Sequence, residues 1–316
     1  MVVVLAGGVG AARMLRGISA VMDPSRVTAI VNTADDTVMH GLRISPDLDT
    51  VTYTLAGAID PDRGWGLVDE SWRAMESLAR YTPHRPAGSS AGGTWFNLGD
   101  RDLATHLYRT ARLAEGATLT EVTAEITCAW GLPHSIVPMT DDTVSTRVRV
   151  NGAWMGFQEY FVGTHHSVAI EAVDFAGIAS ARPTAGVTEA IESAAVIVVA
   201  PSNPLVSIGP LLALPGIRPL LEARREQVVA VSPIVAGAAL KGPADRMLTE
   251  LGHEPSVVGV ARLYAPVCAT MVIDEQDADR ADEIRALGLR CVVTDTIMKT
   301  PEVAAALGRT TLEAIS

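Results

Sequence analysis

The sequence has few cysteines, few aromatic residues and no long apolar run. Its three cysteines, Cys128, Cys268 and Cys291, lie far apart and form no C-x-x-C pair. This pattern argues against a disulfide framework and against a thiolate metal cage. Apolar stretches such as residues 194–200 are much shorter than the ~20 residues that a membrane-spanning helix needs. We therefore expect a cytoplasmic protein without a membrane-spanning segment.

Basic residues are also scarce. The chain has 25 Lys and Arg against 36 Asp and Glu, which gives a formal net charge of −11 at pH 7. Such a chain is repelled by phosphate polymers and by anionic bilayers, so neither nucleic acid nor a membrane is an expected partner. Any anionic ligand must be held by local hydrogen-bond donors.

Short apolar runs rich in β-branched residues recur at both ends of the chain, and helical patterns follow most of them. The runs cover residues 2–5, 27–31, 196–199, 228–231, 271–273 and 291–293. Nearly continuous hydrophobicity over four or five residues is typical of parallel strands that are buried on both faces. The 316 residues allow about two domains at ~150 residues each. We predict an α/β fold with a doubly wound, mostly parallel, Rossmann-like sheet, formed by residues 1–60 and 186–316.

The middle of the chain, residues 61–185, has a different pattern. Helical patterns cover residues 67–80, 103–114 and 118–130, and period-two patterns cover residues 145–150 and 169–175. All aromatic residues except Tyr264 lie between Tyr53 and Phe175. We expect an α+β insertion that caps the core and offers flat apolar side chains to a ligand.

The first predicted strand ends in a glycine turn. Gly7, Gly8 and Gly10 stand between this strand and a helical pattern, so backbone amides there are able to approach a phosphate closely. The turn lacks the Gly-Lys-Ser/Thr of a Walker loop, and Arg13 stands where the dinucleotide fingerprint has its third glycine. A phosphate loop and an ordinary strand-to-helix turn both fit this segment.

Four carboxylates, Asp35, Asp36, Asp47 and Asp49, follow the second predicted strand. That strand ends in Asn32 and Thr33, where a dinucleotide enzyme usually has an acid, which disfavours NAD. Acids beside a phosphate loop are suited to Mg²⁺, which bridges carboxylates to phosphate oxygens. In the alternative interpretation Asp36 and Asp47 cap turns or helices, and Asp49 is the N-cap of a helix over residues 51–59.

Small polar residues and prolines follow two later strands. They are Ser202, Asn203, Pro204, Ser207 and Gly209 after the run at 196–199, and Ser232 after the run at 228–231. Open α/β sheets bind ligands at the carboxyl edge of their strands, so these residues are candidates for a nucleotide site. None of the seven histidines has a metal-binding spacing, and no G-x-S-x-G elbow occurs.

A set of motifs, in order along the chain, resembles the family of 2-phospho-L-lactate transferases of coenzyme F420 biosynthesis. The motifs include S-P-D-L-D-T (45–50), L-G-D-R-D-x-A-T-H (98–106), P-M-T-D-D-x-V-S-T (138–146) and P-S-N-P-x-x-S-I-G-P (201–210). The resemblance implies a Mg²⁺-dependent transfer from a guanosine-diphosphate adduct to the deazaflavin Fo (7,8-didemethyl-8-hydroxy-5-deazariboflavin), with release of GMP. The group transferred is phosphoenolpyruvyl, which gives dehydro-F420-0, or 2-phospho-L-lactyl, which gives F420-0. Homodimers are also expected from the family.

The resemblance and the residue patterns above together predict roles for individual residues. Asp49 and Asp36 are the expected catalytic carboxylates, and Asp49 and Asn97 the expected acceptor contacts, although many relatives have lysine where this chain has Asn97. The residues expected around the guanosine diphosphate are Gly7, Gly8, Gly10, Asn32, Thr33, Ser202, Asn203, Pro204, Ser207, Gly209 and Ser232. Asp35, Asp36, Asp47 and Asp49 are the expected metal ligands. A regulator that binds UDP-sugars without catalysis is the alternative for this fold.

Overall fold

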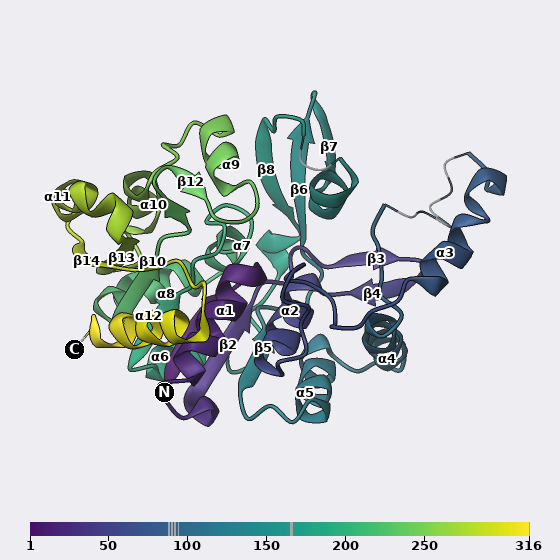
Figure 1. Ribbon diagram of the computed structural model, residues 1–316, viewed down its shortest axis with the longest axis horizontal. Helices are drawn as coiled ribbons and strands as arrows, with labels where there is room; N and C mark the ends of the chain where they lie inside the picture. Colours follow the sequence, from purple (N-terminus) through teal and green to yellow (C-terminus); the bar gives the residue numbers. More distant parts are fainter. Residues whose placement is uncertain (88, 90, 92, 94, 165–166, 316) are drawn as a thin grey trace.

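A seven-stranded sheet forms the centre of the computed structural model, which describes residues 1–87, 89, 91, 93, 95–164 and 167–315 (Figure 1). Its strands are β1 (Val2–Ala6), β2 (Val27–Val31), β5 (Ser135–Pro138), β9 (Val196–Val199), β10 (Val228–Val231), β13 (Thr270–Asp274) and β14 (Arg290–Thr294). The strand order is β14-β13-β10-β9-β1-β2-β5, and every neighbouring pair is parallel. The predicted doubly wound α/β sheet is confirmed.

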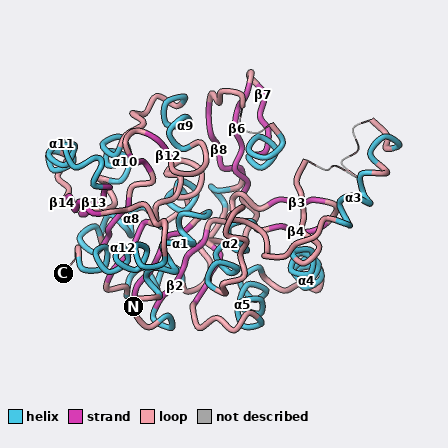
Figure 2. Tube along the Cα trace, in the orientation of Figure 1, coloured by secondary structure: helices cyan, strands magenta, loops and turns pink. Residues whose placement is uncertain are grey.

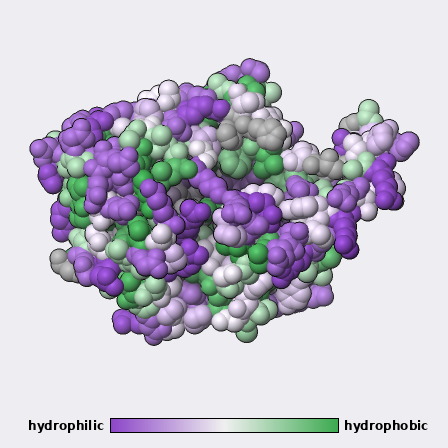
Figure 3. Space-filling view, in the orientation of Figure 1, coloured by the Kyte–Doolittle hydropathy of each residue, from purple (hydrophilic) through white to green (hydrophobic). Residues whose placement is uncertain are grey.

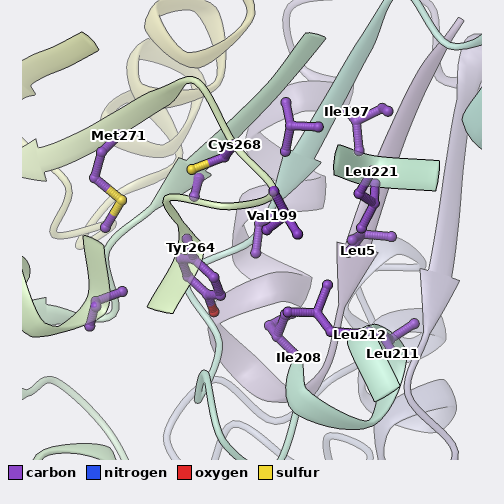
Figure 4. Close-up of a cluster of buried hydrophobic side chains, with 14 of the residues drawn as sticks. Leu5, Ile197, Val199, Ile208, Leu211, Leu212, Leu221, Tyr264, Cys268 and Met271 are labelled. Atoms are coloured by element: carbon purple, nitrogen blue, oxygen red, sulfur yellow. The ribbon is translucent and has the colours of Figure 1, made fainter. Parts of the chain in front are cut away.

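Helices cover both faces of this sheet. On one face lie α1 (Gly8–Ser19), α2 (Pro46–Leu55) and α12 (Pro301–Glu313). On the other lie α6 (Val187–Ser193), α7 (Gly209–Ala213), α8 (Ile217–Ala223), α9 (Ala244–Glu250), α10 (Val257–Tyr264) and α11 (Ala281–Ala286). Within β1, Val4 packs against the first group while Val3 and Leu5 pack against the second, where Leu5 meets Val199 and Leu221 (Figure 4). Both faces are buried, which is why these strands have no polar alternation.

The remaining elements include an arm (residues 37–44 and the described part of 60–101) and a cap (the described part of 145–176), both beside the carboxyl edge of the sheet, and two helices over residues 102–129, the second of which packs against β5 (Figure 2). They are the hairpin of β3 (Thr37–Met39) and β4 (Leu42–Ile44), the helices α3 (Arg73–Ala79), α4 (Asp102–Ala114) and α5 (Leu119–Ala129), and an antiparallel sheet in the order β7-β6-β8. The strands of that sheet are β6 (Ser145–Val150), β7 (Ala153–Gly156) and β8 (Ala172–Ala176), and a π-helix, Glu159–Gly163, follows β7. A short hairpin of β11 (Ile234–Val235) and β12 (Ala238–Ala239) lies between β10 and α9.

The arm that carries α3 projects away from the body, and hydrophilic residues cover much of the visible surface (Figure 3). No helix in the described part of the chain is both long and apolar enough to cross a bilayer.

Two boundaries differ from the sequence prediction. β5 lies within residues 61–185, yet it pairs with β2 in the central sheet, so this segment is not wholly an insertion. Between Ser135 and Pro138, β5 has only two β-branched apolar residues, Ile136 and Val137, which are too few to predict a strand. Helix α2 begins at Pro46, with Ser45 at its N-cap position, and not after Asp49. Proline fits the first turn of a helix because its missing N–H has no partner there in any case. The N-cap interpretation of Asp49 is therefore wrong.

Candidate active site

The candidate site lies where the winding of the sheet changes direction. From β1 the chain continues to β2 on one side, while β9, which pairs with the other side of β1, leads on to β10. The two loops that leave β1 and β9 therefore diverge and open a crevice at the carboxyl edge of the sheet. A cavity of about 580 Å³ occupies this region and extends from the glycine turn to the arm and the cap.

The structure brings many of the predicted site residues to this cavity. Those that line it are Gly7, Gly8, Gly10, Asp35, Asp47, Asp49, Asn97, Ser202, Asn203 and Ser207. Among the other predicted residues, Asn32 and Thr33 are buried beneath the cavity, and Asp36 lies behind Ser45, whose hydroxyl donates to it at 2.6 Å.

Three predicted residues pack next to the cavity without lining it. Gly209 lies against the Phe175 ring and the Pro204 carbonyl, since a Cβ added there would be 3.1 Å and 3.4 Å from them. Ser232 closes a local turn with Ile234, whose carbonyl and amide both bond its hydroxyl. These residues shape the loops that bear the site.

The glycine turn is packed closely against the loop that follows β9. Ser202 Oγ donates to the Gly7 carbonyl at 2.7 Å. A Cβ on Gly10 would overlap the Pro201 carbonyl oxygen, so only glycine allows this approach. The two loops therefore hold each other in place at the crevice.

Asp47 binds the glycine turn from the opposite side. Its Oδ1 accepts from the Gly8 amide at 2.8 Å, and its Oδ2 accepts from Asn32 Nδ2 at 3.0 Å. Burial raises the pKa of Asp47 to about 6. One amide of the turn is thus occupied by a carboxylate of the chain, which fixes the start of α1.

Asp35 and Asp36 each have a free buried oxygen. Within the described ranges, Oδ1 of both side chains lacks a hydrogen-bond partner. Burial raises the pKa of both carboxyls well above the usual range, and the Asp47 carboxylate adds to the effect on Asp35. Unpartnered buried oxygens are costly unless a cation or proton compensates for them, so this pair is suited to a hard divalent ion.

A second charged network joins α2 to α4. Arg109 Nη1 donates to Asp49 Oδ2 at 3.1 Å, and Arg109 Nη2 forms an ion pair with Asp49 Oδ1. His106 lies between two carboxylates, with Nδ1 3.7 Å from Asp49 Oδ2 and Nε2 3.3 Å from Asp102 Oδ2. Tyr53 donates its hydroxyl proton to Asp102 Oδ1 at 2.6 Å.

Asp49, Asp102 and His106 offer ligand atoms within 4.8 Å of one another, which is compatible with a metal ion. Arg109 already supplies a positive charge to Asp49 there. In the described part of the chain, the four predicted metal ligands Asp35, Asp36, Asp47 and Asp49 do not form such a group together. Sequence reasoning missed His106 and Arg109. Their spacing of four and seven residues from Asp102 places all three on one face of α4, and that spacing was the available signal.

Aromatic side chains from two parts of the chain line the cavity. Trp65, Trp95 and Phe96 come from the arm, and Phe157 and Phe161 come from the cap. The Phe157 and Phe161 rings stack with centroids 5.6 Å apart and an interplanar angle of 21°. A Cβ on Gly163 would be 3.6 Å from Trp95 Cε3, so the arm and the cap meet at this aromatic wall.

The fold and the cavity define an α/β protein with a ligand site at the switch point of a doubly wound sheet. A sequence model of the family described as 2-phospho-L-lactate transferase CofD matches residues 2–309. The chain belongs to this family, as the motifs indicated, and it is therefore an enzyme of the transferase class.

Curated relatives match the chain over almost its whole length. A phosphoenolpyruvate transferase of Kitasatospora aureofaciens is 41% identical and is aligned over 98% of this chain and 96% of its own. The phosphoenolpyruvate transferase of Streptomyces griseus is 42% identical and is aligned over 99% of this chain and 97% of its own. That of Mycobacterium ulcerans is 40% identical and is aligned over 98% of this chain and 97% of its own.

A solved structure shares the fold. A Bacillus halodurans protein, in one of its crystal structures, has a TM-score of 0.62 and 16% identity over 98% of each chain. A second crystal structure, described as a member of the upf0052 family, gives a TM-score of 0.59 and 17% identity over 98% of each chain.

Proposed function

We propose that this protein transfers a phosphoenolpyruvyl group from a guanosine-diphosphate adduct to the deazaflavin Fo, giving dehydro-F420-0 and GMP. The names of the curated relatives favour this donor over the 2-phospho-L-lactyl adduct, which would give F420-0. One observation carries the proposal: a single cavity joins a nucleotide-type crevice, at Gly7–Gly10 and Ser202, to an aromatic wall suited to a flat ring.

The chemistry required is displacement at phosphorus. The terminal ribityl hydroxyl of Fo attacks the phosphorus that bears the three-carbon group, a new O–P bond forms, and the bond to GMP breaks. The hydroxyl proton is lost in the same process. If the transition state is loose, positioning and charge neutralisation matter more than a strong base.

The residues divide between nucleotide, metal and acceptor. We assign the glycine turn with Ser202, Asn203 and Ser207 to the nucleotide, and Asn97 and Asp49 to the acceptor; all of these residues line the cavity. We assign to Asp49, held by Arg109, the role of accepting a hydrogen bond from the Fo hydroxyl and orienting it.

We propose Asp35 and Asp36 as the residues that would hold Mg²⁺, because each has a buried oxygen without a partner in the described structure. The ion would neutralise charge on the phosphate oxygens. Asp47 stands beside this pair but is engaged by Gly8 and Asn32. We further propose that the protein acts in the cytoplasm as a homodimer, in line with the family resemblance and the three free cysteines.

The test is a mass-spectrometric assay of the purified protein with Fo, guanylylated phosphoenolpyruvate and Mg²⁺. We expect a dehydro-F420-0 mass and stoichiometric GMP, and loss of both after chelation. Competition with the 2-phospho-L-lactyl adduct identifies the preferred donor. Stabilisation by UDP-sugars without turnover would contradict the proposal and favour a regulator.

A further inference from the structure

One of the two lysines of the chain, Lys241, lines the cavity. It stands between β12 and α9, and its Nζ donates to the Arg63 carbonyl at 2.8 Å. A Cβ on Gly64 would overlap this Nζ and lie 3.4 Å from Val9 Cγ1. The ammonium group is therefore close to the loop that contains Arg63 and to the first turn of α1.

The surroundings of Lys241 are positive. No carboxylate among the described residues forms an ion pair with Lys241 or with Arg13 of α1. Burial lowers the pKa of Lys241, and the nearby Arg13 charge lowers it further. The like charges of Lys241 and Arg13 repel each other, although Lys241 is exposed and water screens part of this repulsion. An anionic ligand would remove this repulsion.

Arg63 is engaged differently. Its guanidinium pairs with Asp60 at 3.0 Å, donates to the Leu67 carbonyl at 2.9 Å, and lies over the rings of Trp65 and Trp72. The loop that receives the Lys241 hydrogen bond is thus fixed by its own contacts. An ammonium has three donors, and the Arg63 carbonyl takes one, so two of them are available to a ligand.

We infer that Lys241 binds the outer phosphate of the guanosine-diphosphate donor, the phosphate at which the transfer takes place. This inference rests on the proposed function. It follows from the position of the ammonium beside the first turn of α1, next to the glycine turn at the switch point. A lysine at this place neutralises charge on the reacting phosphate as a flexible point charge.

The test compares the affinities of GDP and GMP by isothermal titration calorimetry, because GMP lacks the outer phosphate. We expect Lys241→Met to weaken GDP about tenfold or more while GMP changes less than about twofold, as for the loss of one charge-assisted contact. Lys241→Arg, which keeps the charge, should restore most of the GDP affinity. Lys299→Met removes the other lysine, which is exposed like Lys241 but does not line the cavity, and should leave both affinities unchanged.

Two results would overturn the inference. Unchanged GDP affinity in Lys241→Met would show that Lys241 does not contact the outer phosphate. An equal loss for GDP and GMP would show that Lys241 merely holds the Arg63 loop. Failure of the unsubstituted protein to bind GDP is a separate outcome, because it would contradict the proposed function itself.

Discussion

At the scale of single residues, the ion pair between Arg109 and Asp49 does most to fix the floor of the cavity. The side chains are only 2% and 8% exposed, and they join helices α4 and α2 across 60 positions of sequence. A guanidinium buried to this degree requires a carboxylate partner, and the carboxylate in turn requires the guanidinium. The orientation of Asp49 toward the cavity therefore depends on Arg109.

We expect Arg109→Met to lower the free energy of unfolding by about 3–5 kcal/mol, because Asp49 would stay buried without its counter-charge. Arg112, on the same helix, pairs with Glu115 and Glu125 at the surface. Arg112→Met is the matched control and should cost less than about 1 kcal/mol. Urea denaturation of the two variants measures the difference. Equal small losses would show that the buried pair does not hold the two helices.

The buried aspartates after β2 should make the free energy of unfolding decrease as the pH rises. The pKa of Asp47 is raised to about 6, and those of Asp35 and Asp36 are raised well above the usual range. A carboxyl whose pKa is higher in the folded chain binds its proton more tightly there, so its ionisation favours unfolding. We expect the free energy of unfolding without metal to fall as the pH rises above the usual aspartate pKa of about 3.9 toward neutrality.

Asp35→Asn should flatten this dependence and stabilise the metal-free protein at pH 7, while Mg²⁺ should stabilise the unsubstituted chain more than the variant. Urea titrations at pH 5.5 and pH 7.5 measure both effects. Asp62→Asn, at an exposed position, is the control and should keep the original slope. If the free energy of unfolding of Asp35→Asn fell with pH as steeply as that of the unsubstituted protein, ionisation of Asp35 would not destabilise the fold.

At the scale of elements, the sequence correctly predicted those helices and strands that are determined by a local residue pattern. The strand, glycine turn and helix at the start became β1 and α1, and the period-two pattern at 145–150 became β6. The helical pattern at 118–130 became α5, which the structure shows to begin with a capping box of Thr118 and Glu121. Each of these signals lies within a dozen residues, where propensity and periodicity act directly.

Contacts between distant elements could not be predicted in the same way. The pairing of Asp47 with the Gly8 amide joins α2 to α1, and the pairing of Arg109 with Asp49 joins α4 to α2. The sequence predicted Asp47 and Asp49 as metal ligands, but their hydrogen-bond and ion-pair partners depend on how the helices pack. β5 was missed for a related reason, because its four residues owe their strand conformation to β2.

At the scale of the whole molecule, the aromatic wall exists only because the arm and the cap meet. Trp95 comes from the arm, and Phe157 and Phe161 come from the segment after β6. Neither part by itself supplies all of these rings. The aromatic clustering seen in the sequence thus acquires a location, because Trp65, Trp95, Phe96, Phe157 and Phe161 line the same cavity as the glycine turn.

We expect Trp95→Ala to weaken binding of Fo about tenfold, because it removes a large apolar contact from one side of the ring. GDP affinity should change little, since the nucleotide end lies at the glycine turn. Trp154, 44% exposed on β7, contacts Arg147 and Arg149 and does not line the cavity, so Trp154→Ala is the control. Titration of Fo fluorescence with each variant in the presence of GDP measures the effect. If Trp154→Ala weakened Fo as much as Trp95→Ala, the acceptor would have to bind elsewhere than between the arm and the cap.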